Sequence, residues 1–396
     1  MASASEKALL SLLSCELFQQ PISSPSIADY YSLLSDATRH CVTALLYPTL
    51  KQQSDIPAEF LTQVRRAALY SAKSFDATLR CQAEVIDLLN VHGIPCAVLK
   101  GMSVACHYPH PELRLPGDID ILVEEDNLQA ASDAFASAGW TYSHTTDLHV
   151  CYSKDGAEVE IHSAVSRFPD EEKGNFTRHF MADALQHTET VRLHGVTFPA
   201  LSGVYQLIAL LAHMERHLAS SGIGLRQLCD WAVTVHAQRE SIGESELAVL
   251  DQCGLLQFAK VATKTCVKYL GLPTLPWCED AEDDLCDALM SDILDAGNFQ
   301  TQNTRHLSNV LTDTSYDADG KKPSTVRNYF HYIRKRTQKE HPWAKSSVWV
   351  LVFSVYYPIR WIVCMLPEKS KRKRMGRALQ AAKEREKLMW GLKVYK

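Results

Sequence analysis

Residues 117–123 have the sequence GDIDILV, and this stretch decides the fold of the region around it. Because side chains alternate along a β-strand, it predicts a short strand with Asp118 and Asp120 on one face and apolar side chains on the other. Two adjacent carboxylates repel each other unless a cation lies between them. The acidic face therefore predicts a clamp for a divalent metal ion.

A second acidic strand is expected at 157–163, directly after the hairpin turn signal Asp-Gly at 155–156. Alternation places Glu158, Glu160 and His162 on the face opposite its apolar side chains. If this strand pairs beside the first, Glu160 completes a three-carboxylate site for Mg²⁺, and Glu158 is the alternative third acid. His162 is expected to be a hydrogen-bonded neighbour, with a general base as the alternative.

A turn suited to phosphate lies upstream of the acidic strand. Residues 95–99 predict a buried strand, and Lys100-Gly101 leads into a helix expected at 102–108. Glycine lets the backbone approach a ligand closely, and a helix N-terminus attracts phosphate. Further candidate phosphate contacts in this stretch are Ser103, Arg114 and Gly117. The alternative is that Lys100 and Ser103 are surface residues at a helix start. A phosphate cradle beside a metal clamp implies phosphoryl or nucleotidyl transfer.

The periodicity of the whole chain predicts an α+β fold, with a small mixed sheet embedded in a largely helical protein. Five regions are expected in order: an N-terminal helical region at 1–92, the α/β core at 93–200, a helical domain closing the cleft at 201–296, a linker at 297–325, and a basic helical tail at 326–396.

Composition is that of an ordinary globular protein of 396 residues, which excludes collagen-like, wholly disordered and disulfide-scaffold classes. The net charge of −5 is a cancellation. Residues 1–320 hold 21 Lys and Arg against 42 Asp and Glu, a net of −21, whereas residues 321–396 hold 20 against 4, a net of +16. The 12 cysteines form no C-x-x-C pair, and the N-terminus is a poor signal peptide. A reducing cytoplasm is the expected compartment.

The basic tail contains an apolar stretch at 347–366, with 16 apolar residues of 20, interrupted by Pro358 and Arg360. We expect a helix pair packed on the protein. The alternatives are an interfacial anchor to an anionic membrane, placing the protein at the inner face of the membrane, and a true membrane span. Nucleic acid is a weaker candidate partner because the tail has few aromatic residues suited to stacking between its basic ones. Oligomeric state is left open.

Three motifs together resemble a known family. LKG at 99–101, R-x-x-G-D-I-D-I-L-V at 114–123 and E-V-E-I-H at 158–162 look like the uncharacterised bacterial nucleotidyltransferase family of the DNA polymerase beta-like superfamily. The resemblance covers about 60–270 and extends over the helical residues around Arg226. The resemblance implies that the residues named above as candidate phosphate contacts and metal ligands have those roles in this chain.

The resemblance implies a two-metal mechanism. Two Mg²⁺ ions, or Mn²⁺, would bridge Asp118, Asp120 and Glu160, one holding the triphosphate of an NTP and the other lowering the pKa of an acceptor hydroxyl. That hydroxyl attacks the α-phosphate and pyrophosphate leaves. The acceptor class stays open between a small molecule, a sugar or lipid-linked glycan precursor, a protein and an RNA. Many members of the family are linked with cell-surface polysaccharide synthesis.

Two rival functions remain open. One is a nucleotide-binding or scaffold protein at the membrane surface that has lost turnover. The other is a zinc hydrolase, since His213 and His217 share a helical face, although packing against the active-site cleft is the expected role. Arg226 is expected either to pair with Asp230 one helical turn away or to reach the triphosphate.

Overall fold

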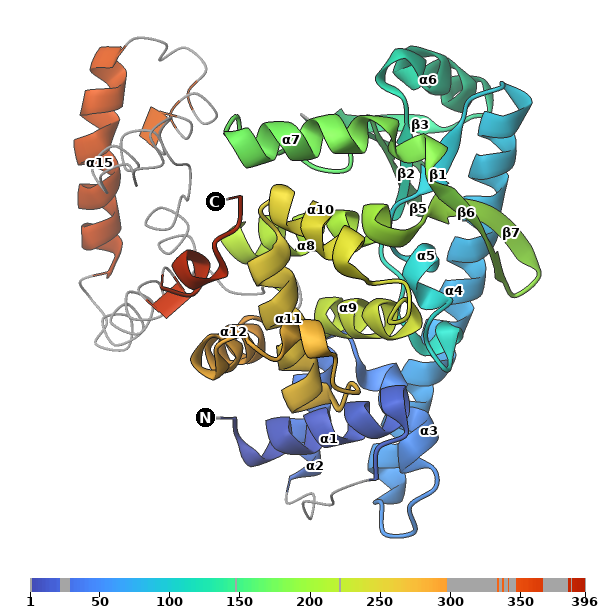
Figure 1. The fold of residues 1–396 in the computed structure, drawn as a ribbon, viewed down its shortest axis with the longest axis vertical. Coiled ribbons are helices and arrows are strands. Elements are labelled where there is room, and N and C mark those ends of the chain that lie inside the picture. Colours follow the sequence, from blue (N-terminus) through green and yellow to red (C-terminus); the bar gives the residue numbers. More distant parts are fainter. Residues whose placement is uncertain are drawn as a thin grey trace.

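A seven-stranded mixed sheet in the order β3-β4-β5-β2-β1-β7-β6 lies in the middle of the chain, with helices packed around it (Figure 1). The computed structural model describes residues 2–21, 29–146, 148–220 and 222–297, and parts of 333–395 that include 347–365 and 387–395. Within these residues the α+β fold expected from the sequence is confirmed.

The strands are short, and their pairing is partly parallel. They are β1 Cys96–Val98, β2 Ile119–Val123, β3 Thr141–Thr145, β4 His149–Lys154, β5 Ala157–His162, β6 Thr188–Leu193 and β7 Val196–Leu201. β2 pairs in parallel with β5 and antiparallel with β1. The predicted placement of the second acidic strand beside the first is therefore confirmed.

Two tight turns join the predicted hairpins. Asp155 and Gly156 connect β4 to β5, and His194 and Gly195 connect β6 to β7. All four residues have positive φ values between 46° and 83°, the backbone that a two-residue type I′ turn requires. The hairpin expected from Asp155-Gly156 is confirmed, and His194-Gly195 forms a second one.

Helices occupy most of the remaining described chain. The α-helices are α1 Ala4–Phe18, α2 Tyr30–Arg39, α3 Tyr47–Leu50, α4 Ala58–Val91, α5 Met102–Ala105, α6 Leu128–Ser137, α7 Glu172–Phe180, α8 Gly203–Ser220, α9 Leu225–Ala237, α10 Glu244–Gln252, α11 Leu256–Leu270, α12 Asp283–Ala296 and α15 Ser347–Met365. α4 runs the length of the molecule and links the N-terminal helices to the sheet (Figure 1).

The two faces of β2 have opposite surroundings. Ile119, Ile121 and Val123 pack in a core with residues of α4 and α6. Leu122, on the other face, belongs to the helical core that includes α8 and α9. Because side chains alternate along the strand, Asp120 lies on the same face as Leu122 and points toward the helices.

Some element boundaries differ from the sequence-based expectation. Within the helical domain expected at 201–296, the helical pattern of 245–270 is divided into α10 and α11 at Gly254, whose φ is +68°. A Cβ at Gly254 would lie 2.6 Å from Tyr395 Cα, so a side chain would collide with the backbone there. β3 and α7 were not expected, since β3 has a polar sequence and is exposed along its whole length.

The apolar stretch of the tail forms one helix, α15, which continues through Pro358, so the expected helix pair is wrong. On α15 the side chains of Val348, Leu351 and Val355 are exposed. Among the described residues, no helix is both long and apolar enough to cross a bilayer. The expected linker after residue 297 and most of the predicted basic tail lie outside the described residues.

Candidate active site

The acidic face of β2 lies beside the end of β1. Leu99 N–H donates to the carbonyl of Asp120 at 3.1 Å. This hydrogen bond places the next residue, Lys100, beside β2. Asp118 directly precedes β2, and Asp120 lies on it in register with Glu160 of the parallel strand β5. The sheet therefore gathers onto one face the three carboxylates that the sequence identified.

Asp120 is a buried carboxylate with two cationic partners. Its Oδ1 lies 2.9 Å from Lys100 Nζ and 3.0 Å from His162 Nε2, while its own exposure is 2%. Burial alone would raise the pKa of Asp120, but Lys100 and the hydrogen bond from His162 outweigh it and hold that pKa below its ordinary value. Asp120 is therefore an anion in the folded protein.

His162 joins the second and third acids. Its Nε2 also lies 3.1 Å from Glu160 Oε2, and burial, which lowers a histidine pKa, is outweighed by hydrogen bonds to Asp120 and Glu160 that raise it. Glu160 Oε1 lies 3.6 Å from His149 Nε2. His162 is thus a hydrogen-bonded neighbour of the acids.

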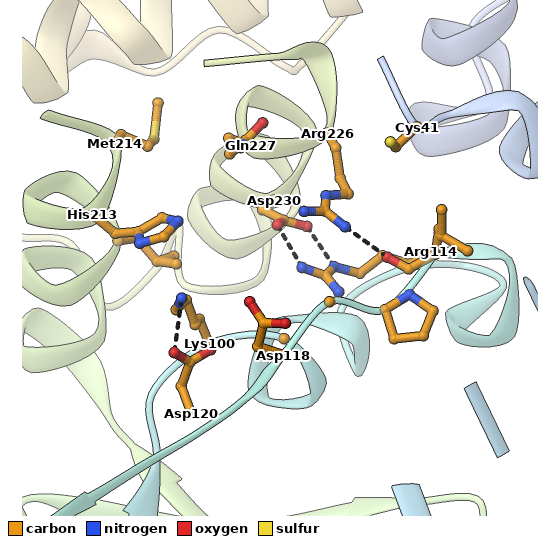
Figure 2. A pocket seen from close by; sticks show the side chains of 15 residues that line it. Cys41, Lys100, Arg114, Asp118, Asp120, His213, Met214, Arg226, Gln227 and Asp230 are labelled. Atoms are coloured by element: carbon orange, nitrogen blue, oxygen red, sulfur yellow. Dashed lines mark hydrogen bonds and ion pairs between the residues drawn. The ribbon is translucent and has the colours of Figure 1, made fainter. Parts of the chain in front are cut away.

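Asp118 has a different environment. Its side chain is accessible to solvent but partly covered by neighbouring groups. This partial burial raises the pKa of Asp118, and the negative charges of Asp120 and Glu160 raise that pKa further. Lys100 acts in the opposite direction. Figure 2 shows the two carboxylates next to each other in the cavity, with Lys100 paired with Asp120 and Asp118 at the side of Arg114. A cation bound beside Asp118 would relieve this carboxylate repulsion.

A cavity of about 390 Å³ opens above these carboxylates (Figure 2). This volume is within the range of small-molecule sites. β2 and its preceding loop form the floor, while α8 and α9 supply the opposite wall. The lining residues beyond the expected set are Cys41, Leu115, Pro116, Leu210, His213, Met214, Gln227 and Asp230.

A second cavity, of about 570 Å³, lies on the other side of the same loop. Gly117 and Asp118 border both cavities. α4 contributes Ala77 and Arg80 to the second cavity, and the β4–β5 hairpin contributes Glu158. The loop before β2 therefore separates the two cavities, and Asp118 is the carboxylate that borders both.

Arg114 is held by an acid rather than left available for a ligand. Its Nε and Nη2 donate to the two carboxylate oxygens of Asp230, both at 2.7 Å, and Tyr108 Oη donates to the same carboxylate at 2.7 Å. All three groups are buried. The expected phosphate donor is thus largely engaged in a buried network, which fixes the loop before β2 to α9.

Arg226 approaches the same loop from α9. Its Nη1 donates to the carbonyl of Leu115 at 3.1 Å, and its guanidinium lies 3.8 Å from where a Cβ on Gly117 would stand. The expected pairing of Asp230 with Arg226 is replaced by the bidentate pair with Arg114. Sequence spacing within one helix could not show this, because the competing partner is 116 residues away.

The expected phosphate turn is only partly present. Gly101 lines the first cavity and has φ +69°, a backbone that favours glycine, but α5 ends at Ala105 and is too short for a useful helix dipole. Ser103 is 1% exposed and does not line the cavity. Lys100 and Gly101 therefore line the cavity, whereas Ser103 does not.

His213 and His217 lie near each other on α8, with ring centroids 4.4 Å apart. His213 lines the first cavity, and burial holds its pKa well below the ordinary value. Among described residues, this pair does not belong to any group of three donors close enough to hold a metal ion. The hydrolytic zinc centre considered for this pair is not supported.

Asp118 and Asp120 offer oxygen donors in the first cavity, which suits hard cations such as Mg²⁺ or Mn²⁺. Glu160 lies on the same face of the sheet, but it does not line this cavity, and among the described residues its carboxylate groups with His149 and His162 and not with the two aspartates. The pKa of Asp118 is raised by partial burial and by the charges of Asp120 and Glu160, so a bound cation would favour its ionised form. Lys100 now supplies part of the positive charge that such a cluster needs.

Comparison with known proteins gives one match. The profile of a family described as uncharacterised nucleotidyltransferase matches residues 28–271, a range that contains every residue lining the first cavity. No curated protein matches the chain.

Proposed function

The chain belongs to the uncharacterised nucleotidyltransferase family, and we propose that it moves a nucleoside monophosphate from an NTP to a hydroxyl or phosphate acceptor, releasing pyrophosphate. The observation that carries this proposal is the pair Asp118 and Asp120 on the floor of a cavity that Lys100 also lines. Carboxylates beside a cation in one cavity suit a metal-bound polyphosphate.

Asp118, Asp120 and Glu160 are the proposed ligands of Mg²⁺, with Mn²⁺ as a substitute. The bound ion would neutralise phosphate charge and lower the pKa of the acceptor hydroxyl. Because Asp120 is already ionised in the folded protein, it needs no deprotonation before it can bind a cation. Partial burial and the charges of Asp120 and Glu160 raise the pKa of Asp118, so a bound cation would favour its ionised form.

Lys100, Gly101, Gly117 and Arg226 are the proposed residues around the triphosphate. Lys100 is the only one of the four with an ammonium, and 23% of its side chain is exposed toward the cavity. Its ion pair with Asp120 is therefore accessible to a competing anion. Gly117 allows the backbone beside Asp118 to approach the nucleotide without an intervening side chain.

The second cavity is the proposed acceptor site. Asp118 borders both cavities, so an acceptor in the second can face a nucleotide in the first across this single residue. Arg80 and Glu158 give the second cavity charges of both signs. A polar acceptor suits this lining, and a glycan precursor of cell-surface polysaccharide is the acceptor class we propose.

The test uses each α-labelled NTP with Mg²⁺ and a cell extract as the acceptor source. We expect labelled product from the wild-type protein and from Asp133→Asn, whose side chain is exposed on α6. Asp118→Asn and Asp120→Asn should lose at least about 10²-fold in rate, since each removes a metal ligand. Wild-type turnover in Asp118→Asn would refute the assignment.

The alternative function is nucleotide binding without turnover. It is favoured by the contacts that already engage Asp120 with Lys100 and Glu160 with His149 and His162. Saturable NTP binding with no labelled product from any extract would establish this alternative.

The proposed location is the cytoplasm, with α15 resting on the inner face of an anionic membrane. The exposed fractions of Val348, Leu351 and Val355 are 66%, 59% and 59%. Burying such side chains in the interface would stabilise binding. We expect Leu351→Glu to reduce flotation of the full chain with anionic liposomes and Leu69→Glu, on α4, to leave it unchanged. Equal flotation of all three proteins would contradict this role.

A further inference from the structure

A second group of metal donors lies on the outer strands of the sheet. His144 on β3 and His149 and Cys151 on β4 bring one ligand atom each to within 4.8 Å of the others. None of the three was assigned a role in nucleotidyl transfer. Their donors are nitrogen and sulfur, whereas Asp118 and Asp120 offer only oxygen.

A β-bulge brings His144 to this place. Tyr142 pairs with Tyr152, but the register then shifts, and His144 pairs with Cys151. Without the extra residue, Ser143 would stand opposite Cys151 and His144 would point to the other face. His149 is two residues from Cys151 on the same strand, so both side chains share that face.

The distances suit a small tetrahedral ion. Cys151 Sγ lies 3.3 Å from His144 Nε2. Zinc ligands at Zn–N of about 2.0 Å and Zn–S of about 2.3 Å stand roughly 3.3–3.6 Å from one another. The closest pair is thus already at ligand spacing, and the remaining donor needs only a side-chain adjustment.

The surroundings of both imidazoles also match those of metal ligands. The hydroxyl of Ser143 lies 3.2 Å from His144 Nδ1, which leaves Nε2 directed at Cys151. A hydrogen bond to the other ring nitrogen is the usual support of a metal-bound histidine. The side chain of His149 is 10% exposed, and its Nδ1 is buried without a hydrogen-bond partner. A buried unpartnered nitrogen is costly unless it binds something.

We propose that His144, His149 and Cys151 form a zinc site, in which Glu160 supports His149 and is not itself a zinc ligand. Glu160 Oε1 lies 3.6 Å from His149 Nε2, the ring nitrogen opposite the buried unpartnered Nδ1. A carboxylate on the other ring nitrogen is a usual support of a metal-bound histidine. Zinc prefers sulfur and imidazole donors, whereas Mg²⁺ does not.

The site would fasten the edge of the sheet. β3 is the edge strand, and its residues are exposed along its whole length. A zinc ion joining β3 and β4 would fix the imidazole of His149, whose Nε2 lies 3.6 Å from Glu160 Oε1. This assignment stands on donors outside the proposed nucleotide cavity and does not depend on nucleotidyl transfer.

The test measures metal binding by the full chain without nucleotide. We expect one Zn²⁺ per chain by elemental analysis, resistant to millimolar Mg²⁺. Co²⁺ in its place should give a thiolate-to-cobalt charge-transfer band. Cys151→Ser should abolish the band, and His144→Ala should weaken Co²⁺ binding at least about tenfold. His144 is exposed, so its variant should fold even if Cys151→Ser does not.

Matched controls separate this site from the proposed catalytic one. Cys15→Ser, a thiol on α1, and Asp118→Asn should both keep the band and the zinc stoichiometry. Absence of a thiolate-to-cobalt band in the wild-type protein would overturn the proposal, as would an unchanged band in Cys151→Ser. Loss of nucleotidyl transfer in Asp118→Asn with the band intact would leave both assignments standing.

Discussion

Lys100 Nζ lies 2.9 Å from Oδ1 of Asp120, an ion pair between the residue after β1 and the middle of the acidic face of β2. The side chain of Asp120 is 3% exposed, so this pair supplies charge compensation that water cannot. The same ammonium borders the first cavity, which is the proposed nucleotide site. Lys100 therefore compensates a buried charge and also lines the proposed site.

Replacing Lys100 should weaken both stability and nucleotide binding. Lys100→Met leaves a buried carboxylate with His162 as its remaining cationic partner, and we expect a loss of about 1–3 kcal/mol in the free energy of unfolding. Nucleotide KM should rise as well. Urea denaturation and steady-state kinetics measure the two effects, with Lys73→Met on the exposed surface of α4 as control. An unchanged unfolding free energy would show that the ion pair does not stabilise the protein.

The stabilising effect of His162 should depend on pH. Asp120 and Glu160 raise the pKa of His162, so its stabilisation is complete below the ordinary histidine pKa of about 6.5 and is lost as pH rises through the raised value. In metal-free buffer, the difference in unfolding free energy between wild type and His162→Gln should shrink from about pH 6 to about pH 9. His92→Gln, at the end of α4, should show a smaller pH dependence. A difference that grows with pH would contradict the assigned charge.

The Arg114–Asp230 pair should be essential for placing the loop before β2. Asp230→Asn leaves Arg114 with an uncompensated buried charge, and we expect a loss of about 3–5 kcal/mol in the free energy of unfolding. The exposed pair of Lys173 and Asp251 is the control, because Asp251→Asn should cost no more than about 1 kcal/mol. Chemical denaturation of both variants decides this, and equal costs would show that burial does not strengthen the first pair.

Filling the second cavity should reduce transfer to the acceptor without weakening nucleotide binding. Ala77 lines that cavity from α4 and is exposed, so Ala77→Trp should fold normally. We expect transfer to the acceptor to fall at least about tenfold while the Kd for NTP stays unchanged, since the nucleotide cavity has no contribution from Ala77. Weaker NTP binding in this variant would place the nucleotide, not the acceptor, in the second cavity.

Local patterns predicted the strands and the hairpin turn that lie beneath the first cavity. The alternation in β2 and β5 and the two dipeptide turns are short-range features, and backbone geometry alone converts them into faces and hairpins. The end of α4 at Val91, before Gly93 with φ +68°, follows from the same local chemistry. The sequence also separated the acidic body from the basic tail.

The partners of the charged residues could not be predicted in this way. Asp230 had an arginine one helical turn away, yet it pairs with Arg114, 116 residues distant. Ser103 stood in a phosphate-binding pattern but is buried, because α5 turns it away from the cavity. The bulge that brings His144 opposite Cys151 left no local signal.

The sequence by itself determined which acidic residues are available and on which face of each strand they lie, because the strand period is a property of the local backbone. Only the tertiary structure decided which charges meet. Burial removes water as the competing partner, so each ion pair depends on which distant group the fold brings within about 3 Å. In this protein the two aspartates have similar sequence contexts but different surroundings in the fold. Asp118 borders two cavities, whereas Asp120 is paired with Lys100.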